Sequence, residues 1–351
     1  MIRAEAALLA CLACTVTPHT PAPGAREARA GGTLNGAHLP LDPATASLAP
    51  EAQTIEQSWL LDLYTWLHSK DYTSERVVFP GTAREEVTAH LLLPAGEGPH
   101  AAVVVFPILA GSHVVSEALA KALVSRGYAV ARLERPEIDL ADPAVGPADF
   151  AAALRSAVLD ARRLIDLVAS HPRVDGGRLA SAGVSLGGLQ ALLLAATDPR
   201  VRGGFFVMVG GGLAELLWDS TERPVRAFRE RLRAERGLAD RAAFVAALRD
   251  ETRDVDPLTY AWLLDPESVL LASGRFDRVM PPARTEELWR ALGRPRWLQL
   301  PVGHYQLFPF FWWTVGRGAD HLDRLLAVPS PADSYSSPEV PKGQPGGDGD
   351  E

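Results

Sequence analysis

The sequence predicts an α/β fold: a mostly parallel sheet with helices on both faces and a helical insertion at one edge. Continuous apolar runs of valine and small residues recur, as in residues 101–106 (AAVVVF), and suit strands covered on both faces. Helical stretches separate these runs, and alternating strands and helices favour a parallel sheet. Residues 210–265 break the alternation because they contain no convincing strand.

The first half of the predicted domain alternates extended and helical segments. Order is expected to begin near Thr54, which can form a capping box with Gln57 at the start of a helix. The predicted helix 116–126 ends at Gly127, and the predicted helix 150–169 ends at His171. The predicted elements are, in order, a hairpin of segments 76–79 and 87–93, the strand 101–106, the helix 116–126, the strand 128–133 and the helix 150–169.

The second half continues this alternation around the insertion. Residues 210–265 are expected to form a helical lid with amphipathic helices at 224–236 and 241–249. Nine arginines against five acids in residues 223–253 indicate a helix face with paired charges, or else attraction of an anionic substrate or lipid headgroup. The remaining predicted elements are the strands 179–184, 205–209, 269–272 and 297–300 and the helices 189–196 and 308–326.

Both ends of the chain differ in composition from the predicted domain, residues 54–328. Residues 1–14 resemble a secretion signal of the lipoprotein type, in which Cys11 or Cys14 would carry the lipid; the alternative is a frayed extension. Residues 15–53, rich in Pro, Ala and Gly, are expected to form a flexible linker, and residues 329–351 a disordered acidic tail. These features predict export and a membrane tether at the cell envelope, and without a working signal a cytoplasmic protein.

The composition excludes several classes of function. A net charge of −8 argues against nucleic acid as a partner. Both cysteines lie in the N-terminal segment, so the predicted domain has no thiol nucleophile, disulfide or cysteine metal site. The sequence contains no metal-ligand cluster, phosphate-binding loop or dinucleotide fingerprint, so we expect neither a metal nor another cofactor.

The stretch around Ser185 carries the strongest indication of chemistry. Residues 183–187 read G-x-S-x-G between the predicted strand 179–184 and the helix 189–196. Glycines allow a turn too sharp for larger side chains, which leaves the serine hydroxyl exposed at the sheet edge. The hydroxyl then faces the start of a helix, where free backbone N–H groups can hold an anion.

A serine hydroxyl needs a neighbouring base, and the base needs a carboxylate that orients it. In an open parallel sheet these groups lie on loops at the carboxyl ends of strands. Asp277 follows the predicted strand 269–272, and His304 follows the strand 297–300. The sequence therefore predicts that Ser185, Asp277 and His304 meet at one edge of the sheet.

Three features of residues 77–326 resemble the α/β-hydrolase superfamily. They are the chain order Ser185, Asp277, His304, the G-x-S-x-G turn around Ser185, and the two loops that carry Asp277 and His304. The resemblance implies an eight-stranded sheet, Ser185 as nucleophile, His304 as general base and acid, and Asp277 as the residue that orients His304. The backbone N–H of Leu186 would supply one oxyanion donor. The loop after residue 106 resembles that of dienelactone-hydrolase-like members, so Ile108 is the expected second donor and Leu109 the alternative.

Other polar residues are weaker candidates. His113 lies in the loop after the strand 101–106 and could contact a substrate, whereas His171 suits a helix cap. Asp256 and Asp265 each precede a proline, which is typical of turns, and either is an alternative triad acid. The aromatic run 308–313 is expected to pack the last helix on the core; alternatively it lines an acyl pocket or touches a membrane interface.

These residues predict a serine hydrolase that cleaves an ester, thioester or amide of a small-molecule substrate through an acyl-enzyme. A carboxylic ester is the substrate we favour. An acyltransferase would use the same three residues, with an alcohol or amine in place of water. A non-catalytic binding protein of the same fold is the alternative of a different class.

Overall fold

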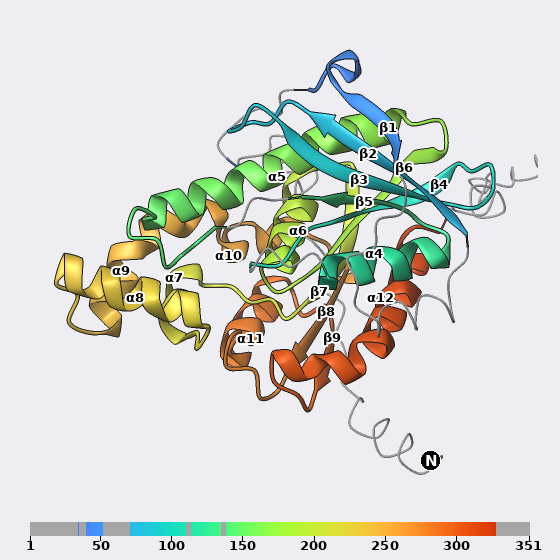
Figure 1. The fold of residues 1–351 in the computed structure, drawn as a ribbon. Helices are drawn as coiled ribbons and strands as arrows, with labels where there is room; N and C mark the ends of the chain where they lie inside the picture. Colours follow the sequence, from blue (N-terminus) through green and yellow to red (C-terminus); the bar gives the residue numbers. More distant parts are fainter. Residues whose placement is uncertain (1–33, 35–39, 52–70, 110–113, 135–137, 328–351) are drawn as a thin grey trace, which may run out of the picture.

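A computed structural model describes residue 34 and residues 40–51, 71–109, 114–134 and 138–327. The described residues form a nine-stranded sheet in the order β1-β2-β3-β5-β4-β6-β7-β8-β9, with helices on both faces (Figure 1). The predicted fold class is confirmed. The segment with Cys11 and Cys14, the helix expected near Thr54 and the tail 329–351 lie outside the described residues.

The sheet has an antiparallel end and a parallel body. Strands β1, β2, β3 and β5 pair antiparallel, and β5, β4, β6, β7, β8 and β9 pair parallel. The strand bounds are β1 Ser47–Glu51, β2 Tyr72–Phe79, β3 Val87–Pro94, β4 His100–Val105, β5 Ala129–Leu133, β6 Val174–Val184, β7 Val201–Val207, β8 Val269–Gly274 and β9 Arg296–Leu300.

Strand β1 corrects the predicted boundary of the linker 15–53 and the predicted count of eight strands. Its register places Pro50 opposite Glu75 of β2, at the edge of the sheet. An edge strand tolerates proline because one side of its backbone has no strand to bond. Composition alone therefore gave the linker a boundary that is wrong, since main-chain pairing holds this segment.

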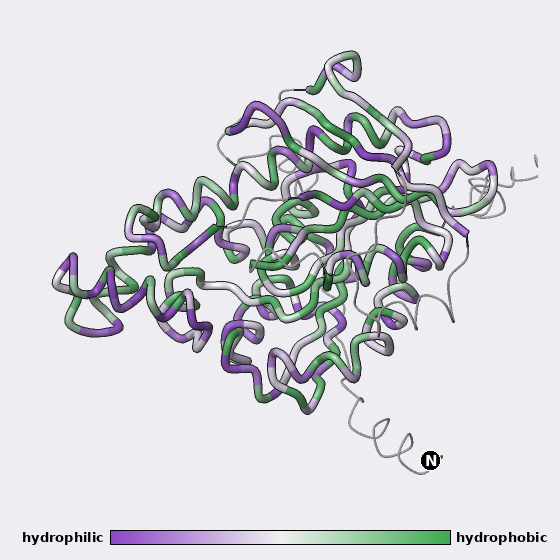
Figure 2. The backbone as a smooth tube through the Cα atoms, viewed as in Figure 1, coloured by the Kyte–Doolittle hydropathy of each residue, from purple (hydrophilic) through white to green (hydrophobic). Residues whose placement is uncertain are grey.

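Two apolar layers sandwich the sheet because successive side chains of each strand point to opposite faces. Along β4, Val103 and Val105 join one buried cluster, and Ala102 and Val104 join the other. Helices α4 Val114–Arg126 and α12 Phe311–Leu325 cover the first face, whereas α5 Pro147–Ser170 and α6 Leu186–Thr197 cover the second. Figure 2 shows the hydrophobic positions concentrated in these central elements.

Residues 210–265 form the predicted helical insertion between β7 and β8. The helices α7, α8 and α9 lie together at one end of the molecule (Figure 1). The short helices α7 and α10 and the helix α11, which follows β8, were not predicted. The bounds are α7 Leu213–Asp219, α8 Arg223–Arg236, α9 Arg241–Thr252, α10 Pro257–Tyr260 and α11 Pro282–Ala291.

Candidate active site

Ser185 occupies the sharp turn between β6 and α6. Its backbone has φ 55° and ψ −126°, a region that non-glycine residues rarely adopt. A Cβ on Gly183 would lie 2.4 Å from the carbonyl carbon of Gly187, so only glycine fits there. The Ser185 N–H donates to the Val207 oxygen at 2.8 Å, which ties the turn to β7. The surrounding fold thus holds a conformation that costs about 1–3 kcal/mol.

Asp277 and His304 meet Ser185 at the carboxyl edge of the sheet. Asp277 follows β8, and His304 lies after β9, directly before the 3-10 helix η5, Tyr305–Phe310. His304 Nδ1 lies 2.7 Å from Asp277 Oδ2, and His304 Nε2 lies 3.1 Å from Ser185 Oγ. The structure therefore brings together the three residues that the sequence predicts to meet.

The environment of Asp277 fixes the direction of this chain of hydrogen bonds. Its side chain is 1% exposed, and its Oδ1 accepts the N–H groups of Val279 and Met280, both at 2.8 Å. The other oxygen is then left for His304 Nδ1. With the Nδ1 proton donated to this carboxylate, Nε2 is free to accept the hydroxyl proton of Ser185.

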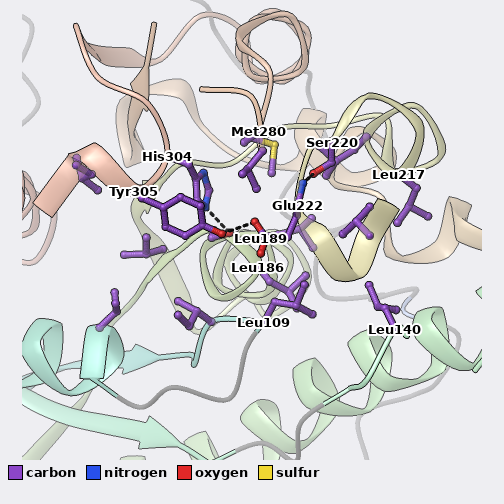
Figure 3. A pocket seen from close by; sticks show the side chains of 18 of the residues that line it. Leu109, Leu140, Leu186, Leu189, Leu217, Ser220, Glu222, Met280, His304 and Tyr305 are labelled. Atoms are coloured by element: carbon purple, nitrogen blue, oxygen red, sulfur yellow. Dashed lines mark hydrogen bonds between the residues drawn. The ribbon is translucent and has the colours of Figure 1, made fainter. Parts of the chain in front are cut away.

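A pocket of about 300 Å³ opens onto Ser185 and His304 (Figure 3). Apolar side chains form most of its wall, and they come from the loop after β4, the insertion and η5. Tyr305 and Phe308 are 66% and 54% exposed. The serine hydroxyl therefore faces a largely apolar space whose walls include two exposed aromatic rings.

Comparison with known proteins connects this geometry to esterases. The acetyl xylan esterase family model matches residues 151–207, which contain β6 and the elbow. The acetyl xylan esterase from Paenibacillus sp. R4 is similar with a TM-score of 0.60 at 18% identity, covering 87% of this chain and 96% of that one. Acetyl xylan esterase 1 from Thermoanaerobacterium sp. JW/SL YS485 gives 0.56 at 17% identity, with 85% and 96% covered. No curated protein sequence matches the chain.

A cold-adapted esterase from an Arctic intertidal metagenomic library is also similar, with a TM-score of 0.50 at 17% identity. The match covers 73% of this chain and 95% of the chain of that esterase. The chain has an α/β-hydrolase fold. The predicted resemblance to this superfamily is therefore confirmed, and Ser185 occupies the sharp turn between β6 and α6 of this fold.

The predicted oxyanion donors of the α/β-hydrolase fold lie on two segments in close contact. Leu186 is the first residue of α6, where the N–H has no acceptor within the helix. A Cβ on Gly187 would lie 2.6 Å from the Phe106 oxygen and 2.7 Å from the Pro107 oxygen. The backbone that leads into Ile108 thus packs directly against the start of α6, and both Ile108 and Leu109 line the pocket. Their role as donors stays a prediction.

The alternative acids and bases have other partners. Asp256 accepts the N–H groups of Gly212, Leu213 and Leu258, so it joins α7 to α10. Burial raises the pKa of its carboxyl group.

Asp265 caps the 3-10 helix Pro266–Ser268 through the N–H of Glu267, and His171 caps α5. His113 lies outside the described residues. Among the described residues, no group of three or more His, Cys, Asp or Glu could hold a metal ion. The part of the chain that the structure describes also contains no helix suited to cross a membrane.

The aromatic run 308–313 and the arginines of the insertion each had two interpretations in the sequence analysis. Phe311 is buried and lines the pocket, so the run 308–313 contributes both to the core and to the site. The arginines of the insertion are largely paired, as expected for a solvated helix face. The ion pairs are Arg229–Glu230, Arg231–Glu235, Arg233–Glu230, Arg236–Glu251, Arg241–Asp219, Arg249–Glu215 and Arg253–Asp250.

Sequence reasoning missed a polar bridge across the pocket. The Tyr305 hydroxyl donates to the carboxylate of Glu222, which precedes α8 (Figure 3). Partial burial, together with this hydrogen bond and the negative charge of Glu222, raises the pKa of Tyr305. The position of Tyr305 next to His304 was the available signal, but its partner lies 83 residues away. The bridge connects the histidine loop to the insertion.

Proposed function

We propose that the protein hydrolyses carboxylic esters through an acyl-enzyme on Ser185. The observation that carries this proposal is the continuous chain from the buried Asp277 carboxylate through His304 to the hydroxyl of Ser185, which opens onto a pocket. The match to the acetyl xylan esterase family model and the esterases among the similar structures support the same conclusion.

The reaction follows from the roles of these atoms. His304 Nε2 takes the hydroxyl proton as Ser185 Oγ attacks the ester carbonyl carbon, and the imidazolium is stabilised by Asp277. The N–H groups of Leu186 and Ile108 would stabilise the oxyanion. When the C–O bond to the alcohol breaks, His304 donates the proton to the leaving oxygen. A water molecule then repeats the sequence on the acyl-enzyme, which releases the acid and restores Ser185.

Hydrolysis of p-nitrophenyl esters from C2 to C12 tests the proposal. Ser185→Ala is expected to lower kcat by at least about 10⁴-fold because the nucleophile is lost. Ser170→Ala is a matched control, since that hydroxyl only donates to the Leu167 oxygen at the end of α5. Equal rates for wild type and Ser185→Ala would contradict the proposal. Added alcohols that divert the acyl group to new esters would identify the acyltransferase alternative.

A further inference from the structure

The pocket extends from the side of His304 and Tyr305 to the side of Leu140 and Leu217 (Figure 3), and the two sides differ. One side, which we call the α7 arm, is formed by Leu140, Leu213, Leu216, Leu217 and Val225. These five side chains are between 0% and 9% exposed, although they face a cavity. The α7 arm is therefore a buried apolar space rather than a solvent-exposed groove. The other side holds His304, Tyr305 and Phe308.

The chemistry of ester cleavage assigns the two sides to the two halves of a substrate. The leaving oxygen must come within hydrogen-bond reach of His304 Nε2, because this atom returns the proton. The carbonyl oxygen must point to the N–H of Leu186. In Figure 3, His304 and Leu217 lie on opposite sides of the pocket, with Leu186 between them. The alcohol half thus lies on the side of Tyr305, and the acyl chain extends along the α7 arm.

The size of the pocket sets the length of the acyl chain. A cavity of about 150 Å³ with aliphatic and aromatic walls holds one benzene molecule. This pocket, at about 300 Å³ for its two sides together, has room for about twice as many non-hydrogen atoms, which an acyl chain of about six to eight carbons, the ester oxygens and a small alcohol group would fill together. An acetyl group would leave the α7 arm empty and would make no contact with its leucines.

From these observations we infer that the acyl group is an uncharged, apolar chain of about six to eight carbons, bound in the α7 arm. This inference rests on the proposed ester hydrolysis at Ser185. The side chains that form the α7 arm are all aliphatic, so an acyl group that ends in a carboxylate would lose the hydration of its charge there without gaining a partner. The substrates named for the similar esterases carry acetyl groups, so this pocket would select a different acyl class.

The first test compares kcat/KM along the p-nitrophenyl ester series. Each methylene buried in the arm should raise kcat/KM by about fourfold, up to six to eight carbons. Leu217→Trp fills the arm and should lower the ratio of C8 to C2 by at least about tenfold, whereas Leu217→Ala should move the optimum to longer chains. Leu232→Trp is the matched control, because Leu232 is buried in α8 and does not line the pocket.

The readout is a ratio within one protein, so partial loss of folded enzyme does not imitate the effect. A wild-type optimum at C2, or a C8 to C2 ratio that changes equally in the Leu217 and Leu232 variants, would overturn the inference. If the wild-type protein hydrolyses none of the esters, that result would instead count against the proposed function.

Binding to the Ser185→Ala protein separates these two failures. Alkanamides from C2 to C10 carry no charge and need no nucleophile, so calorimetry with them measures the arm alone. We expect Kd to fall about fourfold per methylene up to about C8 and then level off. Constant Kd along the series, or binding of glutaramate as tightly as hexanamide, would refute an apolar acyl subsite even if esters are hydrolysed.

Discussion

Replacing Asp277 by asparagine should silence the enzyme without unfolding it. The variant keeps one carbonyl oxygen, which can still accept the N–H groups of Val279 and Met280. Its amide nitrogen then replaces the oxygen that lies 2.7 Å from His304 Nδ1. An amide N–H donates, so Nδ1 must accept and the imidazole proton moves to Nε2. That nitrogen can no longer take the proton of Ser185.

The size of the effect follows from this change of tautomer. A triad with intact geometry and the wrong tautomer loses about 10⁴-fold in kcat. The fold should lose little, because the two backbone hydrogen bonds to Oδ1 stay and one neutral hydrogen bond is worth about 1 kcal/mol. We therefore expect Asp277→Asn to keep a nearly unchanged midpoint of urea unfolding and to lose almost all of its kcat.

The assay is p-nitrophenyl ester hydrolysis at pH 7.5 with urea unfolding of the same preparation. Asp265→Asn is the control, since asparagine caps a helix as well as aspartate does and Asp265 only caps a 3-10 helix. The reasoning is refuted if Asp277→Asn keeps more than about a tenth of the wild-type kcat, or if Asp265→Asn shows the larger loss.

Two further predictions follow from packing and burial. In Gly187→Ala, the new Cβ would lie 2.7 Å from the Pro107 oxygen, so the backbone that leads into Ile108, the proposed oxyanion donor, must shift. We expect kcat to fall by about 100-fold. Gly316→Ala, where a new Cβ meets no atom within 4 Å, should keep full activity, and equal kinetics of the two variants would contradict this prediction. Burial lowers the pKa of His321 to about 4, so unfolded chains bind more protons between pH 6.5 and 4, and about 3 kcal/mol of stability should be lost as pH falls through this window. Urea unfolding of His321→Asn should show a flatter pH dependence, and parallel curves would contradict it.

The sequence predicted where the three side chains of the proposed triad meet, because each follows a strand of a parallel sheet and the carboxyl ends of such strands share one edge. Predicting that Ser185, Asp277 and His304 lie together required no knowledge of side-chain packing. The contact between Tyr305 and Glu222 could not be predicted, because it depends on how the start of α8 sits above η5.

The other missed elements have different causes. The leucines of α7 do follow a helical spacing, but the cavity that they line exists only once the insertion is folded against α5 and α6. Strand β1 escaped detection because proline and alanine dominate the chain before it, and a short edge strand needs only main-chain pairing. The interior of this sheet follows from local patterns, whereas its edge and its pocket follow from tertiary contacts.

Covalent labelling with a fluorophosphonate tests the central claim most directly, because the reagent reports an activated serine without any choice of ester. We predict one adduct per chain, located by mass spectrometry on the peptide with Ser185, together with no adduct in Ser185→Ala and much slower labelling in Asp277→Asn. Absence of an adduct in the wild type, or an adduct on another residue that persists in Ser185→Ala, would contradict the account.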